Sequence, residues 1–206
     1  MLPVITIARQ YGSGGHEVGE KLAQKLGIPF YDKALIAMAA KQSGLSEEVF
    51  ANADEKATSS LLYSMVMGGG YGFGSRIPGL TEMPINDKLF LIQSDIIKKA
   101  AQEGPCVVIG RCADYILREF PHCLNVFIHA DKASRVQRIV AKELCEEKKA
   151  PDFITKKDKQ RANYYNFYSN NRWDDLSNYD FTLDTSKFTI EQAVELLEDA
   201  TRKLDV

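Results

Sequence analysis

The hydrophobic residues of this chain form short apolar runs, separated by longer segments in which apolar residues recur every three or four positions. The first pattern is typical of buried strands and the second of amphipathic helices. We predict five strands, at Val4–Ala8, Ile28–Tyr31, Cys106–Ile109, Leu124–His129 and Phe181–Leu183. Because helical segments separate them, the expected fold is α/β, with three layers: a five-stranded parallel sheet between helices on both faces.

The last helix has the clearest start signal. Thr189 is a good N-cap, and Gln192 three residues later completes a capping box. An apolar stripe follows, made of Ile190, Ala193, Val194 and Leu197. This stripe indicates packing against the sheet and carries no functional assignment.

The stretch between the second and third strands is longer than a crossover requires. Helical patterns occur at Lys33–Gln42, Ser46–Met65 and Asn86–Gln102, which predicts an inserted lobe. The lobe contains a glycine-rich run, Met67–Arg76, too dense in glycine for regular structure. Two interpretations of this run remain open, a mobile lid over a substrate and an inert linker.

A glycine cluster follows the first strand, where residues 9–17 read Arg-Gln-Tyr-Gly-Ser-Gly-Gly-His-Glu. A strand, a glycine-rich turn and a helix together direct backbone N–H groups at one point, which suits a phosphate. The alternative is a plain tight turn. The Walker A pattern G-x-x-x-x-G-K-[ST] fails at three positions, which Arg9, Gly15 and His16 occupy. The dinucleotide pattern G-x-G-x-x-G also fails, because it ends at Glu17, and Asp32 is a weak match to its acidic partner.

Right-handed crossovers place the carboxyl ends of all parallel strands at one edge of the sheet, where ligands of open α/β sheets bind. The chemistry-bearing residues expected there are Gly12–Gly15, Asp32, Gly110, Arg111, Asp131 and Asp184. Arg111 offers a planar fork of donors that matches phosphate oxygens. Asp114 could orient Arg111, hold a metal-bound water or act as a base, or the two could form an ion pair at a helix start.

Positive charge is concentrated between Asp131 and Arg172, where 11 Lys or Arg and six Asp or Glu give an excess of five on a chain of net charge −2. Arg135 and Arg138 share a helix face. Aromatic residues surround Arg161, namely Tyr164, Tyr165, Phe167 and Tyr168. Such a segment could close over a polyanion and a base ring, bind single-stranded nucleic acid, or be a solvated helical pair.

Composition narrows the function classes further. The 206 residues are 45% hydrophobic and 26% charged, which is ordinary for a soluble globular protein. No apolar run approaches the ~20 residues of a membrane span, and no secretory signal opens the chain. The net charge argues against a nucleic-acid partner. The four cysteines and three histidines form no metal-ligand pattern, so we expect reduced thiols and a cytoplasmic protein without membrane contact.

Four segments together are similar to the P-loop nucleoside-monophosphate kinases, in particular to the cytidylate kinase-like family. They are residues 5–19, Gly110–Leu117, Phe127–Ala130 leading to Arg135–Ile139, and Tyr179–Ser186. The resemblance implies a single P-loop kinase domain over residues 1–206. Its core would comprise about 1–31, 103–140 and 174–206, its acceptor-binding insertion about 32–102 and its lid about 141–173.

The resemblance also implies ATP- and Mg²⁺-dependent phosphoryl transfer to a nucleoside monophosphate, foremost CMP or dCMP. It assigns the ATP phosphates to Arg9, Gly12, Ser13, Gly14, Gly15, His16 and Glu17. It assigns catalytic roles to Arg111, Asp114, Arg135, Arg138 and Arg161. The acceptor would contact Asp32 and Arg111.

Two departures from the family pattern keep other functions open. The Walker lysine is absent, and Cys112 stands where the Gly-Arg-Asp motif has its carboxylate, which is displaced to Asp114. Arg9 or His16 could supply the missing donor, and Glu17 or Asp114 could bind Mg²⁺. The alternatives are a catalytically weak nucleotide-binding or sensory module, a kinase for another small acceptor, and a nucleic-acid-binding protein. The oligomeric state is left open.

Overall fold

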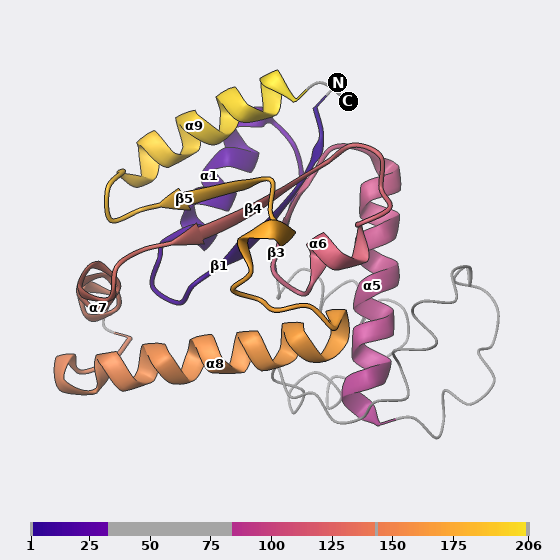
Figure 1. The fold of residues 1–206 in the computed structure, drawn as a ribbon. Helices are drawn as coiled ribbons and strands as arrows, with labels where there is room; N and C mark the ends of the chain where they lie inside the picture. The colour runs from indigo at the N-terminus through magenta and orange to yellow at the C-terminus, as the bar shows by residue number, and fades with distance from the viewer. Residues whose placement is uncertain (1, 33–83, 143, 205–206) are drawn as a thin grey trace.

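The computed structural model describes residues 2–32, 84–142 and 144–204. Its sheet contains β1 (Val4–Arg9), β2 (Phe30–Tyr31), β3 (Val107–Ile109), β4 (Cys123–His129) and β5 (Phe181–Asp184). The strands lie in the order β2-β3-β1-β4-β5, and every neighbouring pair is parallel. The predicted five-stranded parallel sheet is therefore confirmed, and β1 lies at its centre (Figure 1).

The described helices form layers on both sides of this sheet (Figure 1). α1 (Gly15–Leu26) and α9 (Ile190–Lys203) cover one face. α5 (Ile85–Glu103), the short α6 (Ala113–Ile116) and α8 (Ala150–Ser169) cover the other. α7 (Lys132–Ala141) follows β4, and two 3₁₀ turns complete the described elements, η2 (Glu147–Lys149) and η3 (Leu176–Asn178).

Side-chain alternation along β1 explains the two cores. Ile5 and Ile7 point toward α1 and α9, where they meet Val18, Leu22 and Leu197. Val4 and Ala8 point toward the other face. This is the period of two that a strand imposes, and here it serves a sheet that is buried on both sides.

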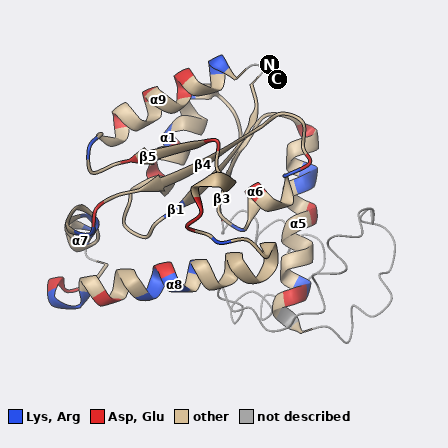
Figure 2. Ribbon diagram, viewed as in Figure 1, with Lys and Arg blue, Asp and Glu red and all other residues tan. Residues whose placement is uncertain are grey.

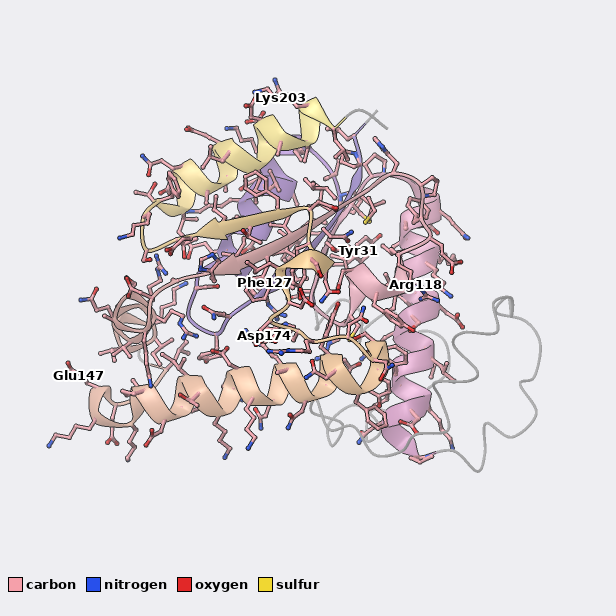
Figure 3. All side chains as sticks on the ribbon, in the orientation of Figure 1. Tyr31, Arg118, Phe127, Glu147, Asp174 and Lys203 are labelled. Atoms are coloured by element: carbon pink, nitrogen blue, oxygen red, sulfur yellow. The ribbon has the colours of Figure 1, made fainter. Side chains whose placement is uncertain are left out.

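The second core is rich in aromatic rings. Phe127 of β4 lies in the space between the sheet and α8 (Figure 3). Its ring centroid is 5.4 Å from that of Trp173 and 4.9 Å from that of Tyr179. On α8, Tyr168 stacks on Phe90 of α5 at a centroid distance of 4.0 Å. These contacts fix α8 beside the carboxyl ends of the central strands.

The second strand begins two residues later than predicted. Gly27 ends α1 in a left-handed conformation with φ 66°, and the Ile28 N–H then donates to the Ala23 carbonyl. Ile28 is thus part of the helix C-cap, and Pro29 lacks an N–H to give to the sheet. The start of α9 agrees with the prediction. Thr189 and Gln192 form the capping box, and Ala193, Val194 and Leu197 are buried.

The predicted helix Asn86–Gln102 corresponds to α5. The two other helices predicted in the insertion, Lys33–Gln42 and Ser46–Met65, and the glycine-rich run Met67–Arg76 lie outside the described residues. The division into core, insertion and lid therefore stays a prediction. No helix in the described part of the chain is long and apolar enough to cross a membrane.

Candidate functional site

The loop between β1 and α1 has the backbone geometry of an anion site. Gly12 and Gly14 adopt positive φ angles of 78° and 81°, which only glycine enters without strain. Gly14 is the N-cap of a 12-residue helix, so the first N–H groups of α1 and the positive end of its dipole lie at the end of the loop. This arrangement favours a phosphate.

Two carbonyl oxygens of this loop accept hydrogen bonds from side chains of other elements. Arg138 of α7 donates to the Gly12 carbonyl at 3.5 Å, and the Thr185 hydroxyl donates to the Ser13 carbonyl at 2.6 Å. Arg138 also donates to the hydroxyl and carbonyl oxygens of Thr185. These donors offset part of the negative charge of the two carbonyl oxygens, which reduces their repulsion of an anion at the helix start.

A cleft of about 410 Å³ lies against the loop. It is lined by loop and helix residues, including Gly12, Gly14, Gly15, His16 and Glu17, and by four basic side chains, Arg9, Arg138, Lys142 and Arg161. The ammonium of Lys142 lies 3.0 Å from the Glu17 carboxylate. The hydrogen bonds from Lys142 and Lys21 lower the pKa of Glu17, so it is ionised at neutral pH.

The ring of His16 lies toward the end of β2. Its Nε2 is 3.2 Å from the carboxylate of Asp32, and the ring meets that of Phe30 edge-on at a centroid distance of 5.3 Å. The structure thus brings together His16, which was predicted to bind the ATP phosphates, and Asp32, which was predicted to contact the acceptor. His16 is half-exposed and lines the outer part of the cleft.

The loop after β3 has a less common backbone. Gly110, Arg111 and Cys112 adopt φ angles of 67°, 58° and 55°, so three residues in a row are left-handed. For the two that are not glycine this conformation costs roughly 1–2 kcal/mol each. Arg111 is buried, and its guanidinium carbon lies 5.7 Å from the centroid of the Tyr164 ring. A strained arginine of this kind points to a function for the side chain that the strain positions.

Asp114, at the start of α6, is buried beside Arg111. The Tyr165 hydroxyl donates to its carboxylate at 2.5 Å. Burial raises the pKa of Asp114 to about 6, and the hydrogen bond from Tyr165 opposes this shift only in part. Asp114 therefore gains or loses its proton close to pH 6. Burial raises the pKa of Tyr165 further above its ordinary value, so this hydroxyl keeps its proton.

Arg111 and Asp114 line a second, smaller cavity of about 30 Å³, together with Gly110, Tyr164, Tyr165 and Trp173. Arg9 and Arg161 line this cavity as well as the loop cleft. Arg161 reaches them from α8: it donates to the Arg9 carbonyl at 2.9 Å, and its guanidinium carbon lies 5.3 Å from the Tyr11 ring centroid. The two cavities therefore meet at a pair of arginines.

The predicted lid arginines have different surroundings. Arg138 and Arg161 line the cleft, whereas Arg135 is not among the residues lining either cavity. Arg135 is buried, forms an ion pair with Asp158 of α8 and donates to the Tyr11 carbonyl at 3.4 Å. Asp158 also accepts the Tyr11 N–H at 2.7 Å. In this structure Arg135 and Asp158 connect α7, α8 and the loop.

The charges and aromatic rings of α8 are separated along the helix. Its charged residues lie between Asp152 and Arg161, and the part from Ala162 to Ser169 carries none (Figure 2). Tyr164, Tyr165 and Tyr168 are buried in the second core. The structure therefore leaves these three rings no exposed surface on which successive bases of a nucleic acid could stack.

The sequence offered two alternative carboxylates for Mg²⁺, Glu17 or Asp114, and they lie in different cavities. Glu17 lines the loop cleft and pairs with Lys142, while Asp114 lines the smaller cavity and accepts from Tyr165. Among the residues that the structure describes, no three His, Cys, Asp or Glu side chains are grouped to hold a metal.

Three residues of the site were not identified from the sequence, Lys142, Asp158 and Thr185, and Tyr165 was named as an aromatic neighbour of Arg161 but not as the partner of Asp114. Thr185 belongs to the segment 179–186 on which the family resemblance partly rests, and this was the available signal. Asp158 and Tyr165 act on partners that are 147 and 51 positions away in the sequence. No local pattern could have shown these two contacts.

Comparisons with known proteins agree with the fold. The model of the cytidylate kinase-like family matches residues 4–187. The structure of an uncharacterized protein from Eubacterium ventriosum is 26% identical, with a TM-score of 0.73, and the match covers 98% of this chain and 99% of that one. A search of the curated proteins found no match.

Two solved kinases share the fold at low identity. Shikimate kinase from Bacteroides thetaiotaomicron is 13% identical with a TM-score of 0.56, covering 98% of this chain and 99% of that one. A gluconokinase from Sinorhizobium meliloti is 15% identical with a TM-score of 0.52, covering 97% and 94%. At these identities the likeness shows the fold alone.

Proposed function

The chain belongs to the cytidylate kinase-like family, and from this premise we propose that it transfers the γ-phosphoryl group of ATP to a nucleoside monophosphate, with CMP or dCMP as the first candidate acceptor. In this reaction an oxygen of the acceptor phosphate bonds to the γ-phosphorus, while the bond from that phosphorus to the bridging oxygen of ADP breaks. The products are a nucleoside diphosphate and ADP.

The observation that carries the proposal is the meeting of two cavities at Arg9 and Arg161. Phosphoryl transfer needs a donor and an acceptor in line, with positive charge where the equatorial oxygens pass between them. The loop cleft, at the N-terminus of α1, suits the donor phosphates. Arg111, beside the smaller cavity, offers a fork of donors for the acceptor phosphate, and the arginines shared by the two cavities lie between it and the donor phosphates.

The remaining residues have supporting roles. The glycine-rich loop and the first turn of α1 present backbone N–H groups to the ATP phosphates, Arg138 and Lys142 add charge along the cleft, and Arg111 binds the acceptor phosphate through its fork. Asp32 holds His16 at the mouth of the cleft. Bound Mg²⁺ would neutralise phosphate charge, and Glu17, an ionised carboxylate that lines the cleft, can bind its water shell.

The structure also favours a second candidate, a kinase for a small alcohol. A phosphate acceptor is already ionised, whereas a hydroxyl acceptor needs a base that removes its proton. Asp114 is a carboxyl in the acceptor cavity whose pKa of about 6 suits that task. The solved structures named as shikimate kinase and gluconokinase add a reason to test alcohols.

The third possibility, a binding module with little turnover, is favoured by Gly15 at the lysine position.

The test is ADP production from ATP and Mg²⁺ with each of CMP, dCMP, UMP, AMP, GMP, shikimate and gluconate. We expect turnover with CMP or dCMP, and its loss in the Arg111→Ala variant. Turnover with an alcohol alone would replace the proposed acceptor class by the second candidate. Stabilisation by ATP without any turnover would favour the binding module.

A further inference from the structure

The side chain of Arg9 runs across two glycines. A Cβ atom placed on Gly15 would lie 2.7 Å from the Cβ of Arg9, a separation that real Cβ atoms essentially never show. A Cβ placed on Gly110 would lie 2.2 Å from the Arg9 Nη1. The stem of Arg9 therefore passes beside the start of α1, and its guanidinium lies over the first residue after β3.

This contact connects two departures from the Walker A pattern. When Gly14 is aligned with the second glycine of that pattern, Arg9 stands at its first glycine and Gly15 at its lysine. Because Cβ atoms at both positions would be only 2.7 Å apart, a side chain at one position excludes a side chain at the other. In this chain the side chain stands at position 9, as arginine, and position 15 is glycine.

We infer that Arg9 is the catalytic cation of this site, taking the place of the absent lysine by reaching the transferring phosphoryl group from the end of β1. This inference rests on the proposed function. The guanidinium is permanently charged and offers several donors in one plane, so it can bind two phosphoryl oxygens where an ammonium acts as a point charge.

The position of Arg9 is well determined by its surroundings. Its backbone belongs to the sheet, paired in register with Ile128 of β4, and its carbonyl accepts the hydrogen bond from Arg161. Two other cations of the cleft have different positions, since Lys142 lies beside Glu17 and Arg138 bonds to Gly12 and Thr185. The head of Arg9 lies over Gly110, between the cleft and the Arg111 cavity.

The steric argument gives a reciprocal test. The variants are Arg9→Met, Arg9→Gly, Gly15→Lys and the double variant Arg9→Gly/Gly15→Lys, with Arg202→Met as a matched control because Arg202 is an exposed arginine on α9. Two quantities are measured, the dissociation constant for MgATP by calorimetry and kcat with the best acceptor. Melting temperature without ligand reports the steric conflict independently of activity.

We expect Arg9→Met and Arg9→Gly to weaken MgATP binding about tenfold and to lower kcat about 10²–10³-fold. Gly15→Lys alone should lower Tm by about 4 °C or more, because its side chain collides with Arg9. The double variant removes that collision and restores a cation at the lysine position. It should recover at least about tenfold in kcat over Arg9→Gly, and Arg202→Met should match the wild type.

The outcomes separate the two hypotheses. MgATP binding that is unchanged in Arg9→Met, or a double variant no more active and no tighter in MgATP binding than Arg9→Gly, would overturn the inference about Arg9. If the wild type binds MgATP through Arg9 but converts no acceptor, the proposed function fails and the Arg9 assignment stands for binding. A wild type that does not bind MgATP would overturn both.

Discussion

The loop after β1 and the loop after β3 follow two paired parallel strands, and each leads into a helix, yet they make their sites in different ways. The first loop enters a helix of 12 residues and takes its left-handed turns with Gly12 and Gly14. The second enters a helix of four residues and places Arg111 and Cys112 in left-handed conformations. One is a site made by backbone, the other a site made by a side chain.

The lengths of the helices explain the difference. A helix of three turns offers aligned N–H groups and a dipole, so the first loop needs glycines that let an anion approach, and the cation inferred for its site, Arg9, belongs to the end of β1 rather than to the loop. A single turn offers little of either. The loop after β3 therefore depends on the guanidinium of Arg111, which is aimed into the smaller cavity at the expense of backbone strain.

Among the variants that compare the two loops, the largest effect is expected at Arg111. Replacing it by alanine removes the charge from the acceptor cavity and should lower kcat/KM by about 10²–10³-fold, with the fold retained. Steady-state kinetics with the best acceptor, together with circular dichroism, measure this. The matched control is Arg118→Ala: the Arg118 guanidinium carbon lies 4.4 Å from the centroid of the Tyr115 ring, but Arg118 is not among the residues lining either cavity. Equal losses in the two variants would contradict the role of Arg111.

The second effect concerns Asp114 and pH. Its pKa rises on folding from 3.8 to about 6, so the native state holds this proton more tightly than the unfolded chain does. The carboxyl therefore makes stability decline as pH rises from about 4 to about 6, by up to about 3 kcal/mol. The Asp114→Asn variant removes the titrating carboxyl and with it this loss of stability, while the amide oxygen can still accept the hydrogen bond from Tyr165.

Urea unfolding at several pH values tests this prediction. The wild type and Asp114→Asn should have similar stability near pH 4, and the variant should be the more stable above pH 6. Two stability curves that stay parallel over this range would show that the Asp114 carboxyl keeps an ordinary pKa in the folded protein.

The same contrast explains what the sequence could predict. The loop after β1 can be predicted from local sequence patterns. These are an apolar run, closely spaced glycines and an amphipathic helix, which the order of the residues alone shows. The five strands and the start of α9 have local signals of the same kind and are confirmed. Arg111 could be predicted because it follows directly on a buried strand and its glycine.

The rest of the site depends on contacts that no local pattern contains. The sequence shows the mismatches to the Walker A pattern at Arg9 and Gly15, but only the structure shows that these two positions exclude each other's side chains. Likewise, Tyr165 and Asp158 act on residues from distant elements. Arg135 and Arg138 were predicted as equivalent charges, and packing gives them different partners, Asp158 and Thr185.

Glycine to alanine at position 12 tests the backbone site. Gly12 has φ 78°, and an added Cβ would lie 3.0 Å from the Arg135 carbonyl oxygen, so Gly12→Ala should destabilise by roughly 2 kcal/mol and weaken MgATP binding about tenfold. Gly27→Ala is the matched control. Gly27 has φ 66° with nothing within 4 Å of an added Cβ, so this variant should lose about 1 kcal/mol and bind MgATP normally. Calorimetry measures the affinity for MgATP, and urea unfolding measures the stability of each variant. Similar affinities for MgATP in the two variants would contradict the prediction.

The smallest effect isolates the strain in the loop after β3. Arg111→Gly and Arg111→Ala both remove the guanidinium, but at φ 58° only alanine keeps the left-handed strain. The glycine variant should therefore be more stable by about 1 kcal/mol, seen as a Tm about 2–4 °C higher, while both variants are equally inactive. Glycine would then be the more stable residue at position 111, as it is at Gly12 and Gly14, and the chain has arginine there because the side chain makes the site. If the two variants melt together, the left-handed turn at Arg111 carries no strain, and its geometry would no longer support a functional role.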